Sequence, residues 1–251
     1  MLEIIIISII QGITEFIPVS SSSHLIIVSK LFNYSSSILL DVSVHIGSFI
    51  AVIIYFRKDL VDFFKEKKLF ILFIIASLPV ILIGYILISF DLTSDLRTLE
   101  IIGWTTILFG IFLYISDNSK QKKNFIKNFK ITAALQIGIA QCLSLVPGVS
   151  RSGIVITACR FLKFSRIDSA KISFLLSIPT LFIISCYGFF EILRNENSIL
   201  MDINFIAMIF SFCFSLIAIK YFLIFLKNFS LLFFVIYRII LGIFLLSIVY
   251  L

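Results

Sequence analysis

Long apolar runs alternate along this chain with short polar segments. Six of the runs approach or exceed the roughly 20 residues that a helix needs to cross the hydrocarbon of a bilayer. They cover residues 38–56, 69–90, 100–116, 170–190, 203–226 and 231–251. This pattern predicts an all-α integral membrane protein with six transmembrane helices.

The segments that connect these runs differ sharply in their lysine and arginine content. Segments 57–68 and 119–130 each hold five such residues, and segment 160–171 holds four. Segments 91–99 and 191–202 hold only one each, Arg97 and Arg194. Because basic residues accumulate on the cytoplasmic side of membrane proteins, we expect the first three segments inside and the last two outside.

Two further apolar stretches are broken by polar motifs. The stretch between residues 130 and 161 has cytoplasmic segments on both sides and is interrupted at Pro147-Gly148, which predicts a re-entrant helical hairpin. Residues 1–17 and 24–32 are likewise separated by Pro18 and a run of four serines. They predict a second hairpin that enters from the outer face. Two full crossings at each motif remain the alternative.

The order of elements repeats in the two parts of the chain. Each part has a broken hairpin followed by three spans, so residues 1–116 and 131–251 read as halves of one membrane domain, residues 1–251. The basic cytoplasmic loop 117–130 joins them. Because the halves start from opposite faces, they predict an inverted-topology repeat, a design that places a binding site near the midplane where interrupted helices meet.

Composition supports a membrane protein and argues against a nucleic-acid-binding one. Hydrophobic residues make up 60% of the chain, and phenylalanine alone occurs 29 times. A soluble domain has about 45–50% apolar residues. The formal net charge is +7, but the cations gather in short connecting segments, as orientation signals do. We therefore expect membrane lipids, and no nucleic acid, as partners.

Helix starts beside the two breaks suit an anion. Ser22 or Ser23 is expected to cap the helix that begins near His24, and Ser152 or Gly153 to open the helix of the second hairpin. A helix N-terminus presents free N–H groups and a positive partial charge. Two of them directed at one place would hold a phosphate or a diphosphate.

Four side chains are candidates for phosphate chemistry, and Arg151 can bind two phosphate oxygens with its planar fork of donors. Ser21 and His24 are three residues apart, so either could attack phosphorus while the other moves its proton. Glu15 could act as a base, orient His24 or hold a divalent cation. A glutamine at position 11, four residues before Glu15, leaves no second carboxylate for a metal. His45 is expected to support the site or to pack.

The two motifs resemble those of the undecaprenyl pyrophosphate phosphatase family, also called the bacitracin-resistance protein family. Residues 11–24, QGITEFIPVSSSSH, resemble its (E/Q)xxxE motif followed by PxSSxxH, with Ser23 where glycine is common. Residues 147–153, PGVSRSG, match its PGxSRSG motif in full. Residues 45–48 and 173–179 are also similar, so the resemblance covers nearly the whole chain.

The resemblance implies an enzyme, an undecaprenyl-diphosphate phosphatase. It would remove the terminal phosphate of a polyprenyl diphosphate lipid, recycle the carrier lipid of peptidoglycan synthesis, and confer bacitracin resistance. It also implies a location in the bacterial inner membrane, a site that faces the periplasm, and a divalent cation such as Mg²⁺ or Ca²⁺. Whether the chain forms a homodimer is left open.

The expected site combines the motif matches with the reasoning above. The nucleophile, whether Ser21, His24 or water, stays undecided. The catalytic residues are expected to be Glu15, Ser21, His24 and Arg151, with Glu15 also a metal ligand, and substrate is expected to contact Gln11, Ser22, Ser150, Ser152 and Gly153.

A transporter or flippase for an anionic polyprenyl phosphate lipid is the rival interpretation, because secondary transporters also use inverted repeats and broken helices. A carrier would need the anion site but no nucleophile, so loss of Ser21 or His24 would separate the two. A purely structural membrane subunit would leave His24 and Arg151 unexplained.

Overall fold

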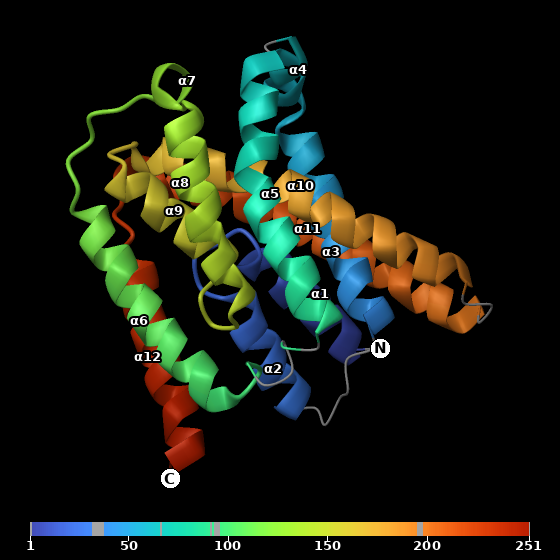
Figure 1. The fold of residues 1–251 in the computed structure, drawn as a ribbon. Coiled ribbons are helices and arrows are strands. Elements are labelled where there is room, and N and C mark those ends of the chain that lie inside the picture. The colour runs from blue at the N-terminus through green and yellow to red at the C-terminus, as the bar shows by residue number, and fades with distance from the viewer. Residues whose placement is uncertain are drawn as a thin grey trace.

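A computed structural model describes residues 2–31, 38–65, 67–90, 92, 96–194 and 198–250. These residues are helical apart from connecting turns and one isolated β-bridge between Lys123 and Phe164 (Figure 1). The all-helical prediction is therefore confirmed for the described part of the chain. Both predicted outer segments, 91–99 and 191–202, lie partly outside the described residues, as do the end of the first hairpin at Phe32 and the chain end at Leu251.

The helices follow one another in the order that hydropathy predicts. They are α1 (Leu2–Thr14), α2 (Ser21–Leu31), α3 (Ile38–Tyr55), α4 (Arg57–Lys65), α5 (Lys67–Ser89), α6 (Leu99–Asp117), α7 (Phe125–Asn128), α8 (Ile131–Cys142), a 3₁₀ turn (Leu143–Leu145), α9 (Arg151–Phe161), α10 (Arg166–Arg194), α11 (Ser198–Asn228) and α12 (Leu232–Tyr250).

Among the described residues, five helices are long and apolar enough to cross a membrane. They are α5, α6, α12 and the stretches Arg166–Phe190 of α10 and Asp202–Asn228 of α11. The sixth predicted span corresponds to α3, whose apolar part Leu39–Tyr55 is a little shorter. Many large apolar side chains on these helices are exposed, among them Ile88 and Phe233. Exposed apolar helix faces of this length mark a membrane protein.

The expectation that residues 57–68 form only a connecting segment is wrong. Arg57–Lys65 is helix α4, and its Leu60 packs against the main apolar core. An amphipathic segment with one apolar stripe becomes helical when that stripe can be buried.

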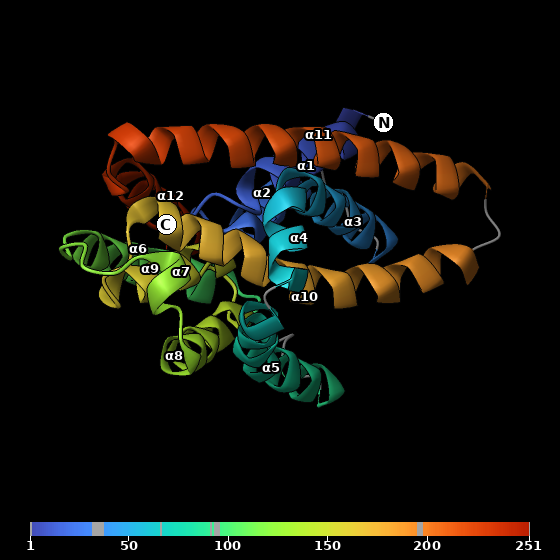
Figure 2. The same ribbon diagram turned by 90° about the horizontal axis from the view of Figure 1, so that it is seen from above.

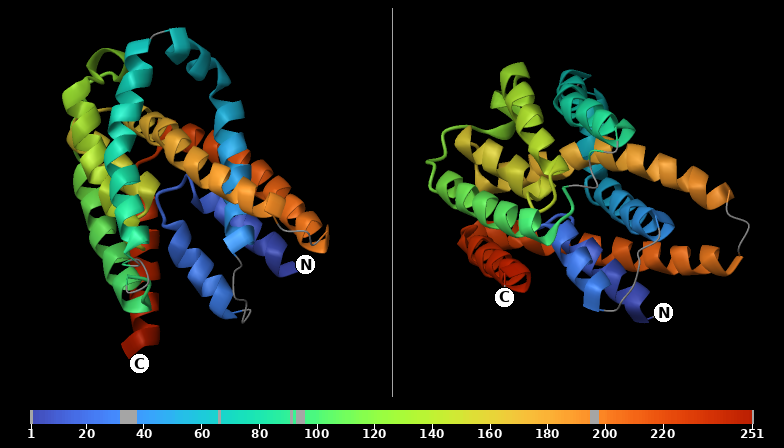
Figure 3. Two further views of the ribbon diagram at one scale, coloured as in Figure 1. Left: turned by 45° about the vertical axis from the view of Figure 1, so that its right-hand side comes forward. Right: turned by 60° about the horizontal axis from the view of Figure 1, so that its bottom comes forward.

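The packing of the helices links the two parts of the chain. α1 packs on α11 and α8 packs on α5, while α6 lies along α12 and α3 lies against α10. Figure 2 shows α10 and α11 as two long helices with α1, α2 and α3 between them. In Figure 3, α1 and α2 lie toward the end that carries the C-terminus, whereas α8 lies toward the end that carries α4 and α7.

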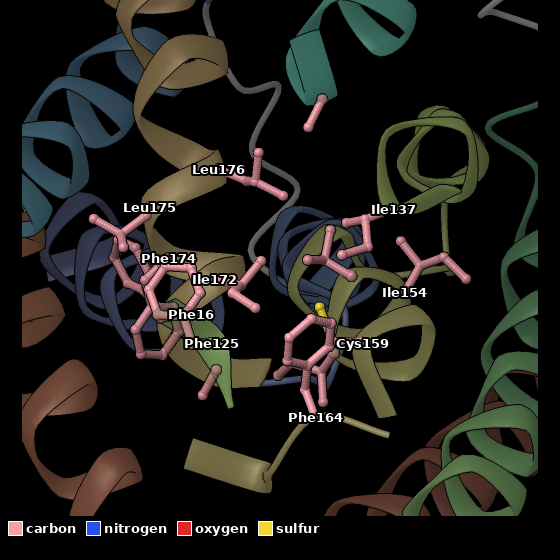
Figure 4. Packing of buried hydrophobic residues seen from close by; sticks show 14 of the residues in the cluster. Phe16, Phe125, Ile137, Ile154, Cys159, Phe164, Ile172, Phe174, Leu175 and Leu176 are labelled. Atoms are coloured by element: carbon pink, nitrogen blue, oxygen red, sulfur yellow. The ribbon is translucent and has the colours of Figure 1, made fainter. Parts of the chain in front are cut away.

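Apolar residues of both polar turns pack in the main apolar core. Phe16, in the turn after α1, is fully buried and meets Phe174 of α10 edge to face, with ring centroids 5.4 Å apart (Figure 4). Val19 and Val149 belong to the same core and stand at the same place in the two turns, one residue before a serine that precedes a helix. Each turn is therefore anchored by apolar contacts while its polar residues remain at the helix starts.

Candidate functional site: two matched turns joined by an ion pair

The end of α1 carries the first pair of site residues. Gln11 and Glu15 are buried, and Gln11 Nε2 donates to Glu15 Oε2 at 2.7 Å. The backbone N–H of Glu15 also donates to the Gln11 carbonyl at 2.9 Å, so the helical turn continues to the carboxylate. The prediction that spacing by four places these two side chains on one face is confirmed.

A serine with positive φ stands directly before each of the helices α2 and α9. Ser20 has φ 73° and Ser150 has φ 70°, a region that residues other than glycine rarely adopt. Ser150 caps α9, since its Oγ accepts from Gly153 N at 3.2 Å. A residue with positive φ cannot belong to a right-handed helix. The helices therefore begin one residue later, α2 at Ser21 and α9 at Arg151.

The predicted caps are therefore wrong by one to three residues. Ser22 and Ser23 lie inside the first turn of α2, and Ser152 and Gly153 lie inside the first turn of α9. Sequence alone did not distinguish among consecutive serines, because any of them can cap a helix.

The two turns contact each other through the serine that is second in each helix. Ser22 Oγ accepts from Gly148 N at 3.4 Å, and Ser152 Oγ donates to the Ile17 carbonyl at 3.0 Å. Gly148 N belongs to the peptide bond between residues 147 and 148, and the Ile17 carbonyl to that between 17 and 18. The contacts are thus reciprocal, and they bring the N-termini of α2 and α9 together, as the sequence predicted.

An ion pair joins the same two halves. Arg151 Nη2 donates to Glu15 Oε1 at 2.7 Å, and the side chains are only 16% and 8% exposed. Glu15 is then engaged on one oxygen by Gln11 and on the other by Arg151. A buried ion pair whose remaining valences are hydrogen-bonded is held in a defined geometry.

Gly148 allows the second turn to approach α6. Its φ is +91°, and a Cβ built there would lie 2.0 Å from Thr105 Oγ1 and 2.7 Å from the Ile102 carbonyl. Thr105 Oγ1 also donates to the Pro147 carbonyl at 2.7 Å. No other residue than glycine fits this position without moving the turn.

Among the four serines at residues 20–23, three have hydroxyls that bond one another and one has a hydroxyl without a bond in the described structure. Ser23 Oγ donates to Ser20 Oγ at 2.9 Å, and Ser22 Oγ lies 3.2 Å from Ser20 Oγ. Within the described part of the chain, no side-chain hydrogen bond engages Ser21, which is half-buried. Ser21 opens α2 at the position that Arg151 occupies in α9, so its hydroxyl is the one available for chemistry.

His24 does not bond Ser21, contrary to the expected pairing. Its Nδ1 lies 2.7 Å from the Ser20 carbonyl and its Nε2 lies 2.5 Å from Tyr237 Oη. Since a carbonyl only accepts, Nδ1 carries a proton, and when the ring is neutral Nε2 accepts from the tyrosine. The backward lean of side chains along a helix directs His24 to the carbonyl four residues before it.

His45 supports the carboxylate, as expected. Its Nε2 lies 3.2 Å from Gln11 Nε2 and 3.9 Å from Glu15 Oε2, and its Nδ1 lies 2.6 Å from the Asp41 carbonyl. The Asp41 carbonyl fixes the tautomer, so the Nε2 lone pair accepts from the Gln11 amide.

Sequence reasoning missed Arg238, in the middle of α12. The side chain is fully buried, and its donors reach the Gly148 carbonyl at 3.0 Å, the Thr106 carbonyl at 3.2 Å and the Pro18 carbonyl at 3.5 Å. One guanidinium thus bridges the two turns at corresponding positions. Gly153 makes room for it, since a Cβ there would lie 2.8 Å from Arg238 Nη1.

No carboxylate pairs with Arg238 among the described residues. Its neighbour Tyr237, which bonds His24, was missed as well. A signal for Arg238 was present: a charged residue inside an apolar run is expensive and usually functional.

The residues here do not form a metal site by themselves. In the described ranges, no group of three His, Cys, Asp or Glu side chains is placed to hold a metal ion. Both oxygens of Glu15 are engaged, although Gln11 Oε1 is buried without a hydrogen-bond partner. Gln11 Oε1 is therefore an unbonded oxygen on the side chain next to Glu15, the expected metal ligand.

The chain is similar to known proteins over nearly its whole length. A model of the family described as bacitracin resistance protein BacA matches residues 4–244. A protein named undecaprenyl-diphosphatase from Pelagibacter ubique is 46% identical to this chain, over 99% of this chain and 98% of its own length. Proteins of the same name from Saccharophagus degradans and Jannaschia sp. are 38% and 36% identical, over 96% and 98% of this chain and 95% and 97% of their own lengths.

Proposed function

The chain belongs to the bacitracin resistance protein family, and from this membership we propose that it is an undecaprenyl-diphosphate phosphatase. It hydrolyses undecaprenyl diphosphate to undecaprenyl phosphate and inorganic phosphate. The product returns the carrier lipid to peptidoglycan synthesis, and removal of the diphosphate confers bacitracin resistance.

One observation carries this proposal: the Glu15–Arg151 pair lies where two helix N-termini meet. Arg151 and Arg238 supply two positive charges and Glu15 one negative charge. The net charge of these three side chains is therefore +1. The free first-turn N–H groups of α2 and α9 add partial positive charge. This arrangement suits the oxygens of a diphosphate.

In the reaction, the bond between the terminal phosphorus and the bridging oxygen breaks. Undecaprenyl phosphate leaves with that oxygen, and the terminal phosphate receives oxygen from water. The terminal phosphoryl group passes in line from the bridging oxygen to the attacking oxygen, and the charge on its equatorial oxygens has to be stabilised during this transfer. Arg151 is placed to bind those oxygens, and exchange of its partner from Glu15 to phosphate would follow from substrate binding.

We assign the nucleophilic role to Ser21. Its hydroxyl is unengaged within the described residues, whereas the other three serines hold the turn together and both nitrogens of His24 are bonded elsewhere. Attack by Ser21 Oγ on the terminal phosphorus would form a phosphoserine and release undecaprenyl phosphate, with the hydroxyl proton passing to Glu15. Attack by water on the phosphoserine would then release phosphate and return the proton to Ser21 Oγ. Glu15 is the general base of the site and His24 a group that orients the start of α2.

The remaining contacts hold substrate and turns. Ser150, Ser152 and Gly153 present the first turn of α9 to the phosphates, Ser22 does the same in α2, and Gln11 orients Glu15. A divalent cation, if bound, would share Glu15 or Gln11 with oxygens of the diphosphate. No step above depends on it.

The membrane topology we propose has six spans, with α3 as the sixth, and two re-entrant hairpins, α1–α2 and α8–α9. Helices of 13, 11, 12 and 11 residues are roughly 17–20 Å long, too short for a core of about 30 Å. Packing of α1 on α11 and of α8 on α5 supports an inverted repeat.

The proposed location is the bacterial inner membrane, with the site open to the periplasm. The basic segments 57–68, 119–130 and 160–171 then face the cytoplasm. Cross-linking of the protein in membranes would show whether it forms a homodimer.

The proposed function is tested by separating hydrolysis from transport. Wild type and Ser21→Ala are reconstituted in vesicles with undecaprenyl diphosphate, and both phosphate release and movement of the lipid between leaflets are measured. We expect phosphate release by wild type and none by Ser21→Ala. Lipid movement by both proteins without phosphate release by either would contradict the phosphatase and favour the transporter.

A further inference from the structure

A polar cavity of about 400 Å³ lies away from the two turns. The end of α6, the end of α9, the start of α10 and the end of α11 surround it. The charged and apolar residues of its lining are Asp117, Arg160, Arg166, Ile167, Leu226 and Lys227. Two lining residues, Gln121 and Lys227, are exposed, so the cavity is reached from the surface. Gln121 belongs to the basic connection between α6 and α7, whose course can be followed in Figure 1.

The cavity has more positive than negative charge. Arg160, Arg166 and Lys227 face a single carboxylate in the lining, that of Asp117. Both oxygens of Asp117 are already engaged: the carboxylate accepts from Arg166 Nε at 2.7 Å, from Arg166 Nη2 at 2.9 Å and from Leu231 N at 3.0 Å. The lining thus keeps a net charge of +2, and among the residues that the structure describes Lys227 forms no ion pair.

A buried arginine with an unused donor lines this cavity. Arg160 is 4% exposed, and its terminal nitrogens bond the carbonyls of Phe164, Asp117 and Ser119. Its Nε lies 3.5 Å from Asp117 Oδ1 but makes no hydrogen bond. Arg160 therefore lines the cavity as a cation that three backbone carbonyls and an ion pair with Asp117 hold in place.

The start of α10 adds backbone donors at the same place. Ser165 caps this helix, since its Oγ accepts from Asp168 N at 2.9 Å. The free N–H groups of the first turn belong to the lining residues Arg166 and Ile167. The Asp168 carboxylate is directed elsewhere, to Phe125 N at 3.3 Å. A 29-residue helix therefore directs its positive end at a cavity already rich in cations.

We propose that this cavity binds a phosphate anion, carried by the headgroup of an anionic lipid or by free phosphate. Its volume accommodates a phosphate with a glycerol unit. Leu226 and Ile167 supply an apolar edge, where the first carbons of a lipid would lie. The site is separate from the Glu15–Arg151 pair and does not depend on the phosphatase activity.

The test uses Lys227→Gln with Lys127→Gln as the matched control. Both lysines are exposed, both changes remove one positive charge, and Lys127, in α7, does not line the cavity. The affinity of the purified full chain is measured, by the shift of its thermal unfolding midpoint, for dioctanoyl phosphatidylglycerol, dioctanoyl phosphatidylcholine and inorganic phosphate. Arg166→Gln is a second variant.

We expect wild type and Lys127→Gln to bind phosphatidylglycerol more tightly than phosphatidylcholine, and Lys227→Gln to lose about fivefold in that affinity. If inorganic phosphate binds the wild type, and its affinity falls by a similar factor in Lys227→Gln, free phosphate is a ligand of the cavity. If only the affinity for phosphatidylglycerol falls, the ligand is the lipid. Phosphate binding between the two turns would be the same in both lysine variants. The proposal would be overturned if Lys227→Gln and Lys127→Gln bound phosphatidylglycerol with equal affinity and also bound inorganic phosphate with equal affinity.

Discussion

Arg151 Nη2 lies 2.7 Å from Glu15 Oε1, although the two residues are 136 positions apart in the chain. The pair connects the end of α1 with the first residue of α9. The serine contacts on either side of it hold the same two turns together. The chemistry we propose therefore depends on contacts between the two halves.

The first prediction concerns the shape of the Arg151 side chain. Arg151→Lys keeps the positive charge but loses the fork that binds two oxygens at once. We expect turnover to fall by about 10²–10³-fold, measured as initial rates of phosphate release. Arg57→Lys, an exposed position of α4, is the control and should match wild type. Activity of Arg151→Lys within threefold of wild type would argue against direct contact with phosphate.

The second prediction separates the nucleophile from the structural serines. Ser21→Ala should abolish turnover and leave the unfolding midpoint unchanged, because no hydrogen bond of the Ser21 side chain is found in the described structure. Ser23→Ala loses the bond to Ser20 and should reduce stability by about 1 kcal/mol while retaining turnover. Full activity in Ser21→Ala would transfer the nucleophilic role to water or His24.

The third prediction concerns Arg238 as a positioning residue. Arg238→Lys keeps a buried cation, but a single ammonium replaces the fork that bridges the carbonyls of Gly148 and Pro18. We expect kcat to fall about tenfold, because one or two hydrogen bonds that position the turns are lost. KM should stay nearly unchanged because the positive charge remains. Steady-state kinetics separate the two constants. A purely structural role would lower the amount of folded protein and leave kcat per folded molecule intact.

The fourth prediction concerns the space at Gly148. Gly148→Ala places a Cβ 2.0 Å from Thr105 Oγ1 and forces alanine to φ +91°. The backbone strain alone is about 1–3 kcal/mol, so the unfolding midpoint and activity should both fall. Gly84→Ala is the control, since its Cβ would meet only the flexible end of Leu145 at 3.3 Å. Equal midpoints for the two variants would contradict the close approach of this turn to α6.

Local spacing and motif were sufficient to predict part of the site. Gln11 and Glu15 share a helix face because they are four apart, and the cost of Arg151 in an apolar segment marked it as functional. Each of the six apolar runs forms one helix, because an apolar run of bilayer length has few other ways to satisfy its backbone hydrogen bonds.

The rest of the site depends on contacts that a sequence does not display. Tyr237 reaches His24 across 213 positions, and Arg238 reaches Gly148 across 90. Which of several consecutive serines takes a positive φ is decided by how the turn packs, with Val19 and Val149 buried beside them. Local preference could not order the serines, so the caps and the Ser21–His24 pairing were predicted wrongly.

The central claim is that the paired turns form a phosphatase site, and the release of inorganic phosphate from undecaprenyl diphosphate tests it most directly. Purified wild type and Arg151→Ala, both confirmed as folded, are compared in detergent over a range of pH and divalent cation. We predict steady release by wild type and none above background by Arg151→Ala. No release by wild type under any condition, or equal release by both proteins, would contradict the account.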